Sequence, residues 1–443
     1  MTPLAEQVVA TAFDTLEEKI KTRTARIGII GLGYVGLPLA AEFASAGYNV
    51  TGIDVSPAKV AMLSAGSSYI LDVESSAVEK LVAAGRLTAT NDFSVIAGLD
   101  TISICVPTPL RKTKDPDLSY IVDATEQIAR HLHPGMLIVL ESTTYPGTTE
   151  ELVLEILEKS GWKVGEDFFL CFSPERVDPG NTKYQTRNIP KVVGGVTGKC
   201  TRLGAALYGQ AVERVVPVST SRVAETVKLL ENTFRMINIG LANEIAQLCD
   251  RIGVDVWEVI DAAATKPFGF MPFYPGPGLG GHCIPIDPFY LSWKTKQAGI
   301  EARFIELAGQ INGQMPLFVT QKIQNALNDC SRPLRGSHVH ILGVAYKRDI
   351  SDLRESPALD VIHLLQARGA RLTYSDPYIP AIDETNLQLS SEEPFSACKA
   401  ADCVVIITDH TSVDYPALLA VSRLVVDTRN ALKGHRSEKI VRL

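Results

Sequence analysis

Short apolar runs alternate with helical patterns from residue 26 to about residue 215. Residues 26–33 predict a buried strand entering a glycine-rich turn, residues 34–47 a helix ending at Gly47, and residues 48–54 a second strand. Further strand-like runs are TISICVP at 101–107, MLIVLEST at 136–143, FFLCFSP at 168–174 and PKVVGGV at 190–196. This alternation predicts a parallel sheet covered by helices on both faces. Residues 4–22 predict a short amphipathic helix packed outside this first domain.

The middle of the chain has a helical pattern without strands. Apolar residues recur at spacings of three and four over residues 219–264, with one pause near Gly253, which predicts one long helix or a pair of helices. A proline- and glycine-rich segment follows at residues 266–290, and a second helical stretch covers about 288–329. An irregular segment of this length is usually functional.

The strand pattern returns near the C-terminus. Residues 338–346 predict a strand, 356–370 a helix, and 371–377 a second strand. This second strand ends near Asp376, just as the second strand of the first domain ends at Asp54. Two more strand candidates lie at 404–409 and 424–430. This last part lacks a Gly-x-Gly turn, so we do not expect it to hold a dinucleotide in the same way.

Together these patterns predict an α/β fold of two Rossmann-like, doubly wound domains joined by an all-α central domain with a long helix. The predicted boundaries are residues 1–215, 216–328 and 329–443.

Composition agrees with a folded protein of two or three domains. The chain has 443 residues, of which 46% are hydrophobic and 21% charged, and this excludes disorder, collagen-like repeats and a small disulfide scaffold. A net charge of −7 argues against a nucleic-acid or anionic-membrane surface. No signal-peptide pattern and no long apolar run occur, so we expect no membrane partner and a cytoplasmic protein with reduced thiols.

The eight cysteines show no C-x-x-C spacing, which argues against a zinc ribbon or a thioredoxin motif. We expect seven of them to be small buried hydrophobic residues. Cys283 differs because Gly278, Gly280 and Gly281 come just before it. The glycines would let a ligand approach the backbone closely, and a thiolate there could act as a nucleophile. The alternatives are a structural cysteine and a metal site with His282, although no further ligands cluster nearby.

The most specific motif is Gly31-x-Gly33-x-x-Gly36 between a predicted strand and a predicted helix. Asp54 ends the next strand, 18 residues past Gly36 and close to the spacing of dinucleotide-binding units. The glycines allow a pyrophosphate to approach the helix N-terminus, and the Asp54 carboxylate would bind ribose hydroxyls while repelling a 2′-phosphate. The motif therefore favours NAD over NADP. The alternative is a glycine-rich turn needed only for packing.

Three other motifs each have two interpretations. Lys228 and Asn232, four residues apart, could stabilise a negative oxygen or could form a solvated helix face. Glu175 follows a strand and could transfer a proton or form a loop salt bridge. Lys347 and Arg354 precede a predicted helix and could bind phosphate or belong to a charged surface loop.

In combination these motifs resemble the UDP-glucose/GDP-mannose dehydrogenase family, from about Arg26 to the C-terminus. The matching segments are GLGYVGLPLA, CVPTP, ESTTYPGTTE, SPERVDPG, KLLEN, GPGLGGHCIPID and GVAYKRDISDLRESPAL. The resemblance implies an NAD-binding domain, a central helical dimerisation domain and a C-terminal UDP-sugar-binding domain. It therefore implies NAD as cofactor, a UDP-sugar as substrate and a homodimer or a higher assembly of dimers.

The resemblance also implies roles for individual residues. The catalytic set is Cys283, Lys228, Asn232, Asp287 and Glu175. The NAD-contacting set is Gly31, Gly33, Tyr34, Val35, Gly36, Asp54, Lys59, Thr108, Ser142, Thr143 and Arg354. The substrate-contacting set is Glu175, Arg176, Lys228, Asn232, Gly278, Gly280, Gly281 and Lys347. No metal is implied. Cys283 would be the nucleophile, Lys228 and Asn232 would stabilise the oxyanion, Asp287 would assist water or proton transfer, and Glu175 would be the general acid/base.

The implied reaction is a four-electron oxidation at C6 of the sugar through a thiohemiacetal and a thioester on Cys283. The sequence departs from the UDP-glucose branch in two places. Cys283 precedes Ile-Pro-Ile-Asp, and the segment before the glycine-rich loop, where that branch has an arginine, offers Lys266 and no arginine. This segment is more similar to the branch that oxidises UDP-N-acetylhexosamines for surface polysaccharides, above all UDP-N-acetylglucosamine. UDP-N-acetylmannosamine, UDP-N-acetylgalactosamine and UDP-glucose are alternatives. More distant ones are a two-electron β-hydroxyacid dehydrogenase and an inactive NAD-binding scaffold.

Overall fold

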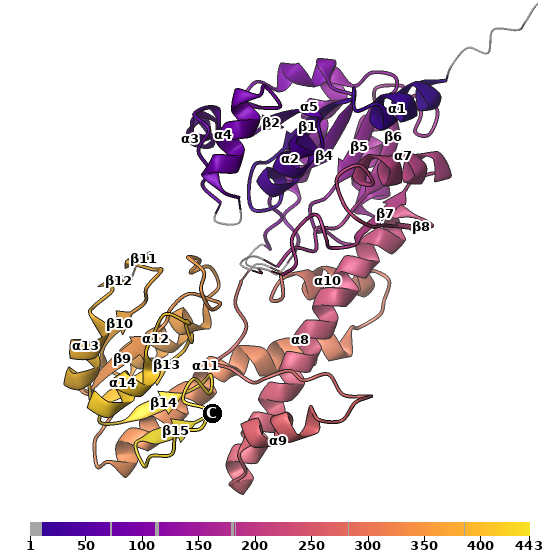
Figure 1. The fold of residues 1–443 in the computed structure, drawn as a ribbon. Helices are drawn as coiled ribbons and strands as arrows, with labels where there is room; N and C mark the ends of the chain where they lie inside the picture. The colour runs from indigo at the N-terminus through magenta and orange to yellow at the C-terminus, as the bar shows by residue number, and fades with distance from the viewer. Residues whose placement is uncertain are drawn as a thin grey trace, which may run out of the picture. The chain divides into compact units, whose positions relative to one another are not determined.

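The structure is a computed structural model that describes residues 11–70, 73–110, 115–178, 181, 183–281, 283–384 and 386–443 (Figure 1). The chain divides into two compact units, residues 1–230 and 231–443, and the division falls inside the long helix α8 (Ser221–Ile252). The amphipathic helix expected at 4–22 is α1 (Ala12–Lys21), and the first residues of that prediction lie outside the described residues.

The first unit contains an eight-stranded sheet. Its strands follow the order β3 (Leu87–Thr90), β2 (Asn49–Ile53), β1 (Arg26–Ile30), β4 (Thr101–Ile104), β5 (Leu137–Leu140), β6 (Phe169–Phe172), β7 (Lys191–Gly195) and β8 (Val215–Val218). The strand order changes direction between β1 and β4, which is where doubly wound sheets bind ligands, at the carboxyl ends of the strands.

The sheet is parallel, as the sequence predicts, except for one pair: β6 and β7 are antiparallel. A parallel neighbour requires a long crossover, usually through a helix. The described residues between β6 and β7 form no helix, so the chain turns back and β7 runs in the opposite direction.

Helices flank this sheet (Figure 1). Several of them begin at a residue whose side chain caps the helix or end next to a glycine in the left-handed conformation. Thr11 and Asp14 form a capping box at α1, Ser56 caps α3, and Gly47 adopts a φ of 101° just after α2. The remaining bounds are α2 (Gly36–Ser45), α3 (Pro57–Ser64), α4 (Ser75–Ala83), η1 (Phe93–Gly98), α5 (Ser119–His131), η2 (Thr149–Leu154), α6 (Glu155–Glu158) and α7 (Gly198–Tyr208).

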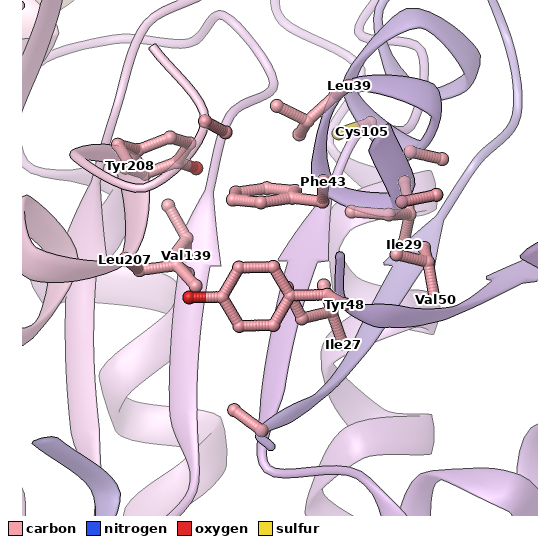
Figure 2. Packing of buried hydrophobic residues seen from close by; sticks show 14 of the residues in the cluster. Ile27, Ile29, Leu39, Phe43, Tyr48, Val50, Cys105, Val139, Leu207 and Tyr208 are labelled. Atoms are coloured by element: carbon pink, nitrogen blue, oxygen red, sulfur yellow. The ribbon is translucent and has the colours of Figure 1, made fainter. Parts of the chain in front are cut away.

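The strands are apolar on both faces because each face packs into its own core. On β5, Leu137 and Val139 join one buried cluster, whereas Ile138 and Leu140 join another. Figure 2 shows the first cluster, in which Phe43 of α2 lies between aromatic rings. Its ring centroid is 6.1 Å from that of Tyr48 and 5.7 Å from that of Tyr208. The continuous apolar runs in the sequence therefore reflect a sheet buried on both sides.

The second unit begins with helices and continues into a five-stranded parallel sheet. After α8, the helices are α9 (Val256–Ala263), α10 (Asp287–Gln297) and α11 (Arg303–Asp329). The sheet order is β10 (Arg371–Ser375), β9 (His338–Leu342), β13 (Cys403–Ile406), β14 (Val425–Asp427) and β15 (Ile440–Arg442). Its helices are α12 (Pro357–Ala367), α13 (Pro394–Ala400) and α14 (Tyr415–Val421), and β11 (Ala381–Glu384) pairs with β12 (Leu387–Ser390) in a separate hairpin.

The predicted fold class is confirmed, with Rossmann-like sheets in the N- and C-terminal parts and helices between them. Of the two alternatives for residues 219–264, the structure has the pair of helices, and Gly253 adopts a φ of 71° between α8 and α9. The helical stretch expected at 288–329 is two helices, with Gly299 at a φ of 75° in the gap. Within the described residues, every helix is too short or too polar to cross a membrane.

A buried carboxyl group caps a helix in the first unit. Glu225 of α8 accepts hydrogen bonds from the backbone N–H groups of Gly147 and Thr149 at 2.5 and 2.9 Å, and from the Thr149 hydroxyl at 2.7 Å. Burial raises the pKa of Glu225 from 4.5 to about 7, although these hydrogen bonds oppose the rise. The folded state therefore holds a proton on Glu225 at pH values where the unfolded chain has lost it.

We predict that Glu225→Gln reduces the pH dependence of stability. Because the pKa is raised in the folded state, the contribution of Glu225 to the free energy of unfolding falls as pH rises from 4.5 through 7. Between pH 5 and 8, the free energy of unfolding of the wild-type protein should fall by on the order of 2 to 3 kcal/mol more than that of the Glu225→Gln variant. Urea unfolding at a series of pH values measures this difference. The exposed Glu126→Gln variant is the control and should follow the wild type; parallel profiles for all three proteins would refute the prediction.

Candidate active site

The three glycine positions of the first turn differ in what a side chain would meet there. A Cβ on Gly36 would lie 1.9 Å from the carbonyl oxygen of Gly31, and one on Gly31 would lie 2.6 Å from that of Cys105. Gly31 also has a φ of 90°. A Cβ on Gly33, by contrast, would meet nothing within 4 Å. Packing thus explains Gly31 and Gly36, whereas Gly33 leaves the backbone open before the N-terminus of α2, as a bound pyrophosphate requires.

Asp54 holds this turn against the next strand. Its buried carboxylate accepts hydrogen bonds from the backbone N–H of Leu32 at 2.8 Å and of Ser56 at 2.9 Å. Lys59 lies 3.2 Å from the same carboxylate. A carboxylate has about four acceptor positions, so Asp54 retains capacity for a ribose hydroxyl. The residues fit NAD, and Asp54 also has a structural role in shaping the turn.

The other cofactor residues expected in this unit lie at the carboxyl ends of neighbouring strands. Tyr34 is exposed and Val35 half-buried at the start of α2, while Thr108 follows β4. Ser142 and Thr143 follow β5, and the Ser142 hydroxyl donates to a carbonyl oxygen beyond β4 at 2.7 Å. The strands thus gather these predicted residues along one edge of the sheet. Arg354 instead lies in the second unit, where its guanidinium binds Asp352 at 2.6 Å.

Glu175 belongs to a buried ion cluster that the sequence did not reveal. Its Oε2 lies 3.1 Å from Nζ of Lys191, which lies 2.6 Å from Oε2 of Glu141. The Tyr208 hydroxyl donates to the other oxygen of Glu141 at 2.5 Å. The Glu175 carboxylate also accepts the backbone N–H groups of Arg176 and Val177, both at 2.7 Å.

The cluster shifts the pKa values of its two carboxyl groups in opposite directions. Burial raises the pKa of Glu141, and Lys191 offsets this only in part. Burial also disfavours ionised Glu175, but Lys191 and the backbone N–H groups outweigh it and lower the pKa of Glu175. Glu175 is therefore ionised at neutral pH, which suits the proton-accepting half of the acid/base role and not the proton-donating half. The predicted loop salt bridge is present as well, with a buried partner.

In the second unit, the turn after Cys283 brings three predicted residues together. The carbonyl oxygen of Cys283 accepts the backbone N–H of Ile286 at 3.2 Å and of Asp287 at 2.8 Å. Asp287 then begins α10, and its buried carboxylate accepts the side-chain N–H of Asn232 at 2.5 Å. Cys283 itself is exposed. One backbone turn thus joins the exposed residue Cys283 to the buried Asp287–Asn232 pair.

Lys228 and Asn232 occupy a buried part of α8. Lys228 is 8% exposed and Asn232 is 7% exposed. The alternative of a solvated helix face is therefore wrong. A buried ammonium group and amide one helical turn apart are costly to maintain without a partner, and such groups are frequent at functional sites.

The glycines before Cys283 contact protein. A Cβ on Gly280 would lie 2.7 Å from Cβ of Tyr346, and one on Gly281 would lie 2.7 Å from the ring of Tyr346. Gly278 has a φ of 140°, and a Cβ there would lie 3.1 Å from Pro357. These glycines are needed for close packing between the Cys283 loop and the loop after β9, whether or not their N–H groups also bind a ligand.

The C-terminal sheet repeats the aspartate of the first sheet with different partners. Asp376, after β10, accepts the backbone N–H groups of Val344 and Ala345 at 2.7 and 3.0 Å. His410 fills the space beside it, with Nε2 3.0 Å from the carboxylate. Lys347 is half-buried in the loop after β9. Among the described residues, Asp376 therefore has an imidazole partner that Asp54 lacks, and the expectation that this sheet does not bind a dinucleotide as the first one does stays a prediction.

Arg429 is a second residue that the sequence did not single out. It follows β14, and its Nε donates to the carbonyl oxygen of Ile407 at 2.8 Å. A Cβ on Gly276 would lie 2.6 Å from its guanidinium, so Arg429 lies against the glycine-rich loop. Burial, helped by Arg348, lowers its pKa to about 10, which leaves it charged at neutral pH. The only signal in the sequence was a cation at the carboxyl end of a strand.

The cysteines and the metal alternative can be compared with the structure. None of the eight cysteines is in a disulfide, and six of the seven expected to be buried are buried. Cys330 is exposed, because it follows the last turn of α11. The metal alternative depended on His282, which lies outside the described residues. Elsewhere among the described residues, no three His, Cys, Asp or Glu side chains are grouped as a metal site.

Comparison with known families matches nearly the whole chain. Residues 25–212 match the NAD-binding domain of the UDP-glucose/GDP-mannose dehydrogenase family, residues 222–314 its central domain, and residues 340–434 its UDP-binding domain.

Individual relatives agree. The chain is 34% identical to a UDP-N-acetyl-D-mannosamine dehydrogenase from Pyrococcus horikoshii, over 92% of this chain and 96% of the relative. It is 35% identical to a UDP-N-acetyl-D-glucosamine 6-dehydrogenase from Pseudomonas aeruginosa, over 81% and 84%. A solved UDP-D-ManNAc dehydrogenase from Pyrococcus horikoshii superposes with a TM-score of 0.87 at 34% identity, over 94% of this chain and 98% of that one. The chain belongs to the UDP-glucose/GDP-mannose dehydrogenase family of NAD-dependent oxidoreductases.

Proposed function

We propose that the protein oxidises the C6 hydroxymethyl group of a UDP-N-acetylhexosamine to a carboxylate. The observation that carries this proposal is that Cys283 is an exposed cysteine joined by a single backbone turn to the buried Asp287–Asn232 pair. A dehydrogenase that stopped at the aldehyde would need no thiol. Bound NAD would accept a hydride in each of the two oxidation steps.

The side chains divide the chemistry between them. Glu175, ionised by Lys191, would accept the proton of the C6 hydroxyl as the first hydride leaves. The Cys283 thiolate would then add to the aldehyde carbon, and the second hydride would leave from that carbon to give a thioester. Water would cleave the thioester, releasing the carboxylate and the thiol, with Asp287 accepting a proton from that water.

Lys228 and Asn232 would stabilise negative charge on the sugar oxygen during thiolate addition and thioester hydrolysis. Both side chains are buried, so their charge and dipole act in a medium that screens them poorly. Asn232 donates one N–H to Asp287, and its amide has a second N–H for the substrate oxygen.

The two relatives are named for UDP-N-acetylhexosamine substrates, one for UDP-N-acetyl-D-mannosamine and one for UDP-N-acetyl-D-glucosamine. This supports the hexosamine class over UDP-glucose, in line with the Ile-Pro-Ile-Asp sequence after Cys283. Within the class, UDP-N-acetylglucosamine stays our prediction from the sequence. We propose that the diphosphate of the substrate is bound by Lys347, Arg429 and the loop at 278–281, which all belong to the second unit. We place the reaction in the cytoplasm, where thiols such as Cys283 stay reduced.

Incubation with NAD and a panel of UDP-sugars tests this proposal. The panel contains UDP-N-acetylglucosamine, UDP-N-acetylmannosamine, UDP-N-acetylgalactosamine and UDP-glucose, and products are identified by mass spectrometry. We expect a carboxylic acid from an N-acetylhexosamine and a kcat/KM for UDP-glucose that is lower by at least about tenfold, the effect of losing roughly 1.4 kcal/mol of transition-state binding. Preferential oxidation of UDP-glucose, or an aldehyde as the final product, would contradict the proposal.

A second prediction concerns the thiol. Cys283→Ser should bind NAD and the UDP-sugar with near wild-type affinity but form the acid at least about a hundredfold more slowly, because a hydroxyl is a far weaker nucleophile than a thiolate. Isothermal titration measures binding, and quenched-flow mass spectrometry measures acid formation. Cys330→Ser, at the other exposed cysteine, is the matched control and should retain full activity. Uronate formation at the wild-type rate by Cys283→Ser would remove the thiol from the mechanism.

We also propose that two copies of the chain associate through α8. Phe234, Leu241, Leu248 and Ile252 are exposed apolar residues on this helix. At 100° per residue they fall within about 40° of one another, so they form one narrow stripe. A twofold axis would place the same stripe of a second copy against it, which is the commonest way for a soluble protein to bury such a surface.

The double variant Leu241→Asp/Leu248→Asp should therefore lower the molecular mass in solution to that of one chain, since a dimer would bury four unpaired carboxylates. Light scattering after size exclusion measures the mass. Arg235→Asp, exposed on another side of α8, should leave the assembly unchanged. A double variant with the wild-type mass would show that the stripe is not the interface.

A further inference from the structure

We propose that Lys191 is a positioning residue of the active site: its ammonium group holds the Glu175 carboxylate in place and keeps it ionised as the proton acceptor. This inference rests on the proposed function, because that function brings Glu175 into contact with the substrate. Lys191 belongs to none of the motifs that carry the family resemblance, and it acts on the substrate only through Glu175.

The reversed strand explains how a lysine reaches this place. Cys171 of β6 lies opposite Gly195 of β7, and Phe172 lies opposite Gly194. Each step forward on β6 is one step back on β7, so the same register continued beyond β6 sets Glu175 opposite Lys191. In a parallel neighbour, the first residue of the strand would lie at the other edge of the sheet. The antiparallel β7 therefore delivers a cation to the edge where the cofactor residues gather.

The environment of Lys191 makes its charge effective. Lys191 is 4% exposed, and its Nζ lies 2.6 Å from Glu141 and 3.1 Å from Glu175. Burial alone would lower the pKa of Lys191, but the two carboxylates raise it, so the ammonium persists. A buried cation at this distance stabilises an ionised carboxylate far more than a surface ion pair does.

Other charged groups near Glu175 determine whether a substitution raises or lowers the pKa of its carboxyl group. The titratable and charged groups around it are Lys191 on β7, Glu141 after β5, Cys105 after β4, Tyr208 on α7 and the adjacent Arg176. Arg176 uses its Nη1 to donate to the carbonyl oxygen of Pro190 at 2.6 Å. Glu141 competes for Lys191 and repels Glu175, so removal of Lys191 and removal of the Glu141 charge act in opposite directions.

The test is the acidic limb of the pH profile of kcat/KM. With Lys191→Met, the pKa of Glu175 rises, and the limb should move to higher pH by about one unit or more. With Glu141→Gln, Lys191 pairs with Glu175 alone, and the limb should move to lower pH. Lys191→Arg restores the charge and should bring the limb back toward its wild-type position. Lys199→Met, which removes an exposed lysine on α7, is the control and should not move it.

A purely structural role for the cluster would lower the melting temperature of these variants and leave the limb in place, and this result would overturn the inference. If Lys191→Met does not fold, the direction of the shift in Glu141→Gln decides, since an unmoved limb or a shift to higher pH contradicts us. The Glu175→Gln variant separates a failure of the role of Lys191 from a failure of the role of Glu175 in the proposed function. Loss of turnover in Glu175→Gln, with an unmoved limb in the other variants, refutes the role of Lys191 only. Wild-type turnover by Glu175→Gln refutes the role of Glu175 in the proposed function, and the inference falls with it.

Discussion

The hydrogen bond from a backbone N–H after the first strand of each sheet to an aspartate after the second strand shapes both nucleotide-binding parts of the protein. In the first unit, Leu32 donates to Asp54 at 2.8 Å. In the second, Val344 donates to Asp376 at 2.7 Å. The first turn leaves open space at Gly33, whereas His410 occupies the side of Asp376. The same backbone interaction therefore has different surroundings in the two sheets, with open space at Gly33 in the first and His410 against Asp376 in the second.

The proposed chemistry uses charged groups that the fold buries. Glu175 and Lys191 form a pair because β7 reverses direction, and Asn232 and Asp287 form a pair because the Cys283 turn leads straight into α10. Buried pairs of this kind contribute little net stability, because desolvation offsets their attraction. Their value lies in fixed protonation states and fixed orientations, which the proposed oxidation needs at each proton transfer.

Local features were predictable from the sequence, and long-range ones were not. The turn at Gly31–Gly36, the strand ending at Asp54 and the helix break at Gly253 each follow from neighbouring residues. The partnership of Lys191 with Glu175 depends on the register of an antiparallel strand pair, which no local pattern specifies. The sequence suggests ligand contacts for the glycines before Cys283, yet Gly280 and Gly281 pack against Tyr346, more than sixty positions away. Arg429 was missed for the same reason.

The central claim is that a single active site carries out two successive oxidations through Cys283. The direct measurement is the number of NADH molecules formed per UDP-sugar consumed, taken with an aldehyde-trapping reagent present. The account predicts two NADH per sugar, a carboxylate product and no trapped aldehyde, because the thiol holds the intermediate. One NADH per sugar with a carbonyl product, or quantitative trapping of an aldehyde, would contradict it.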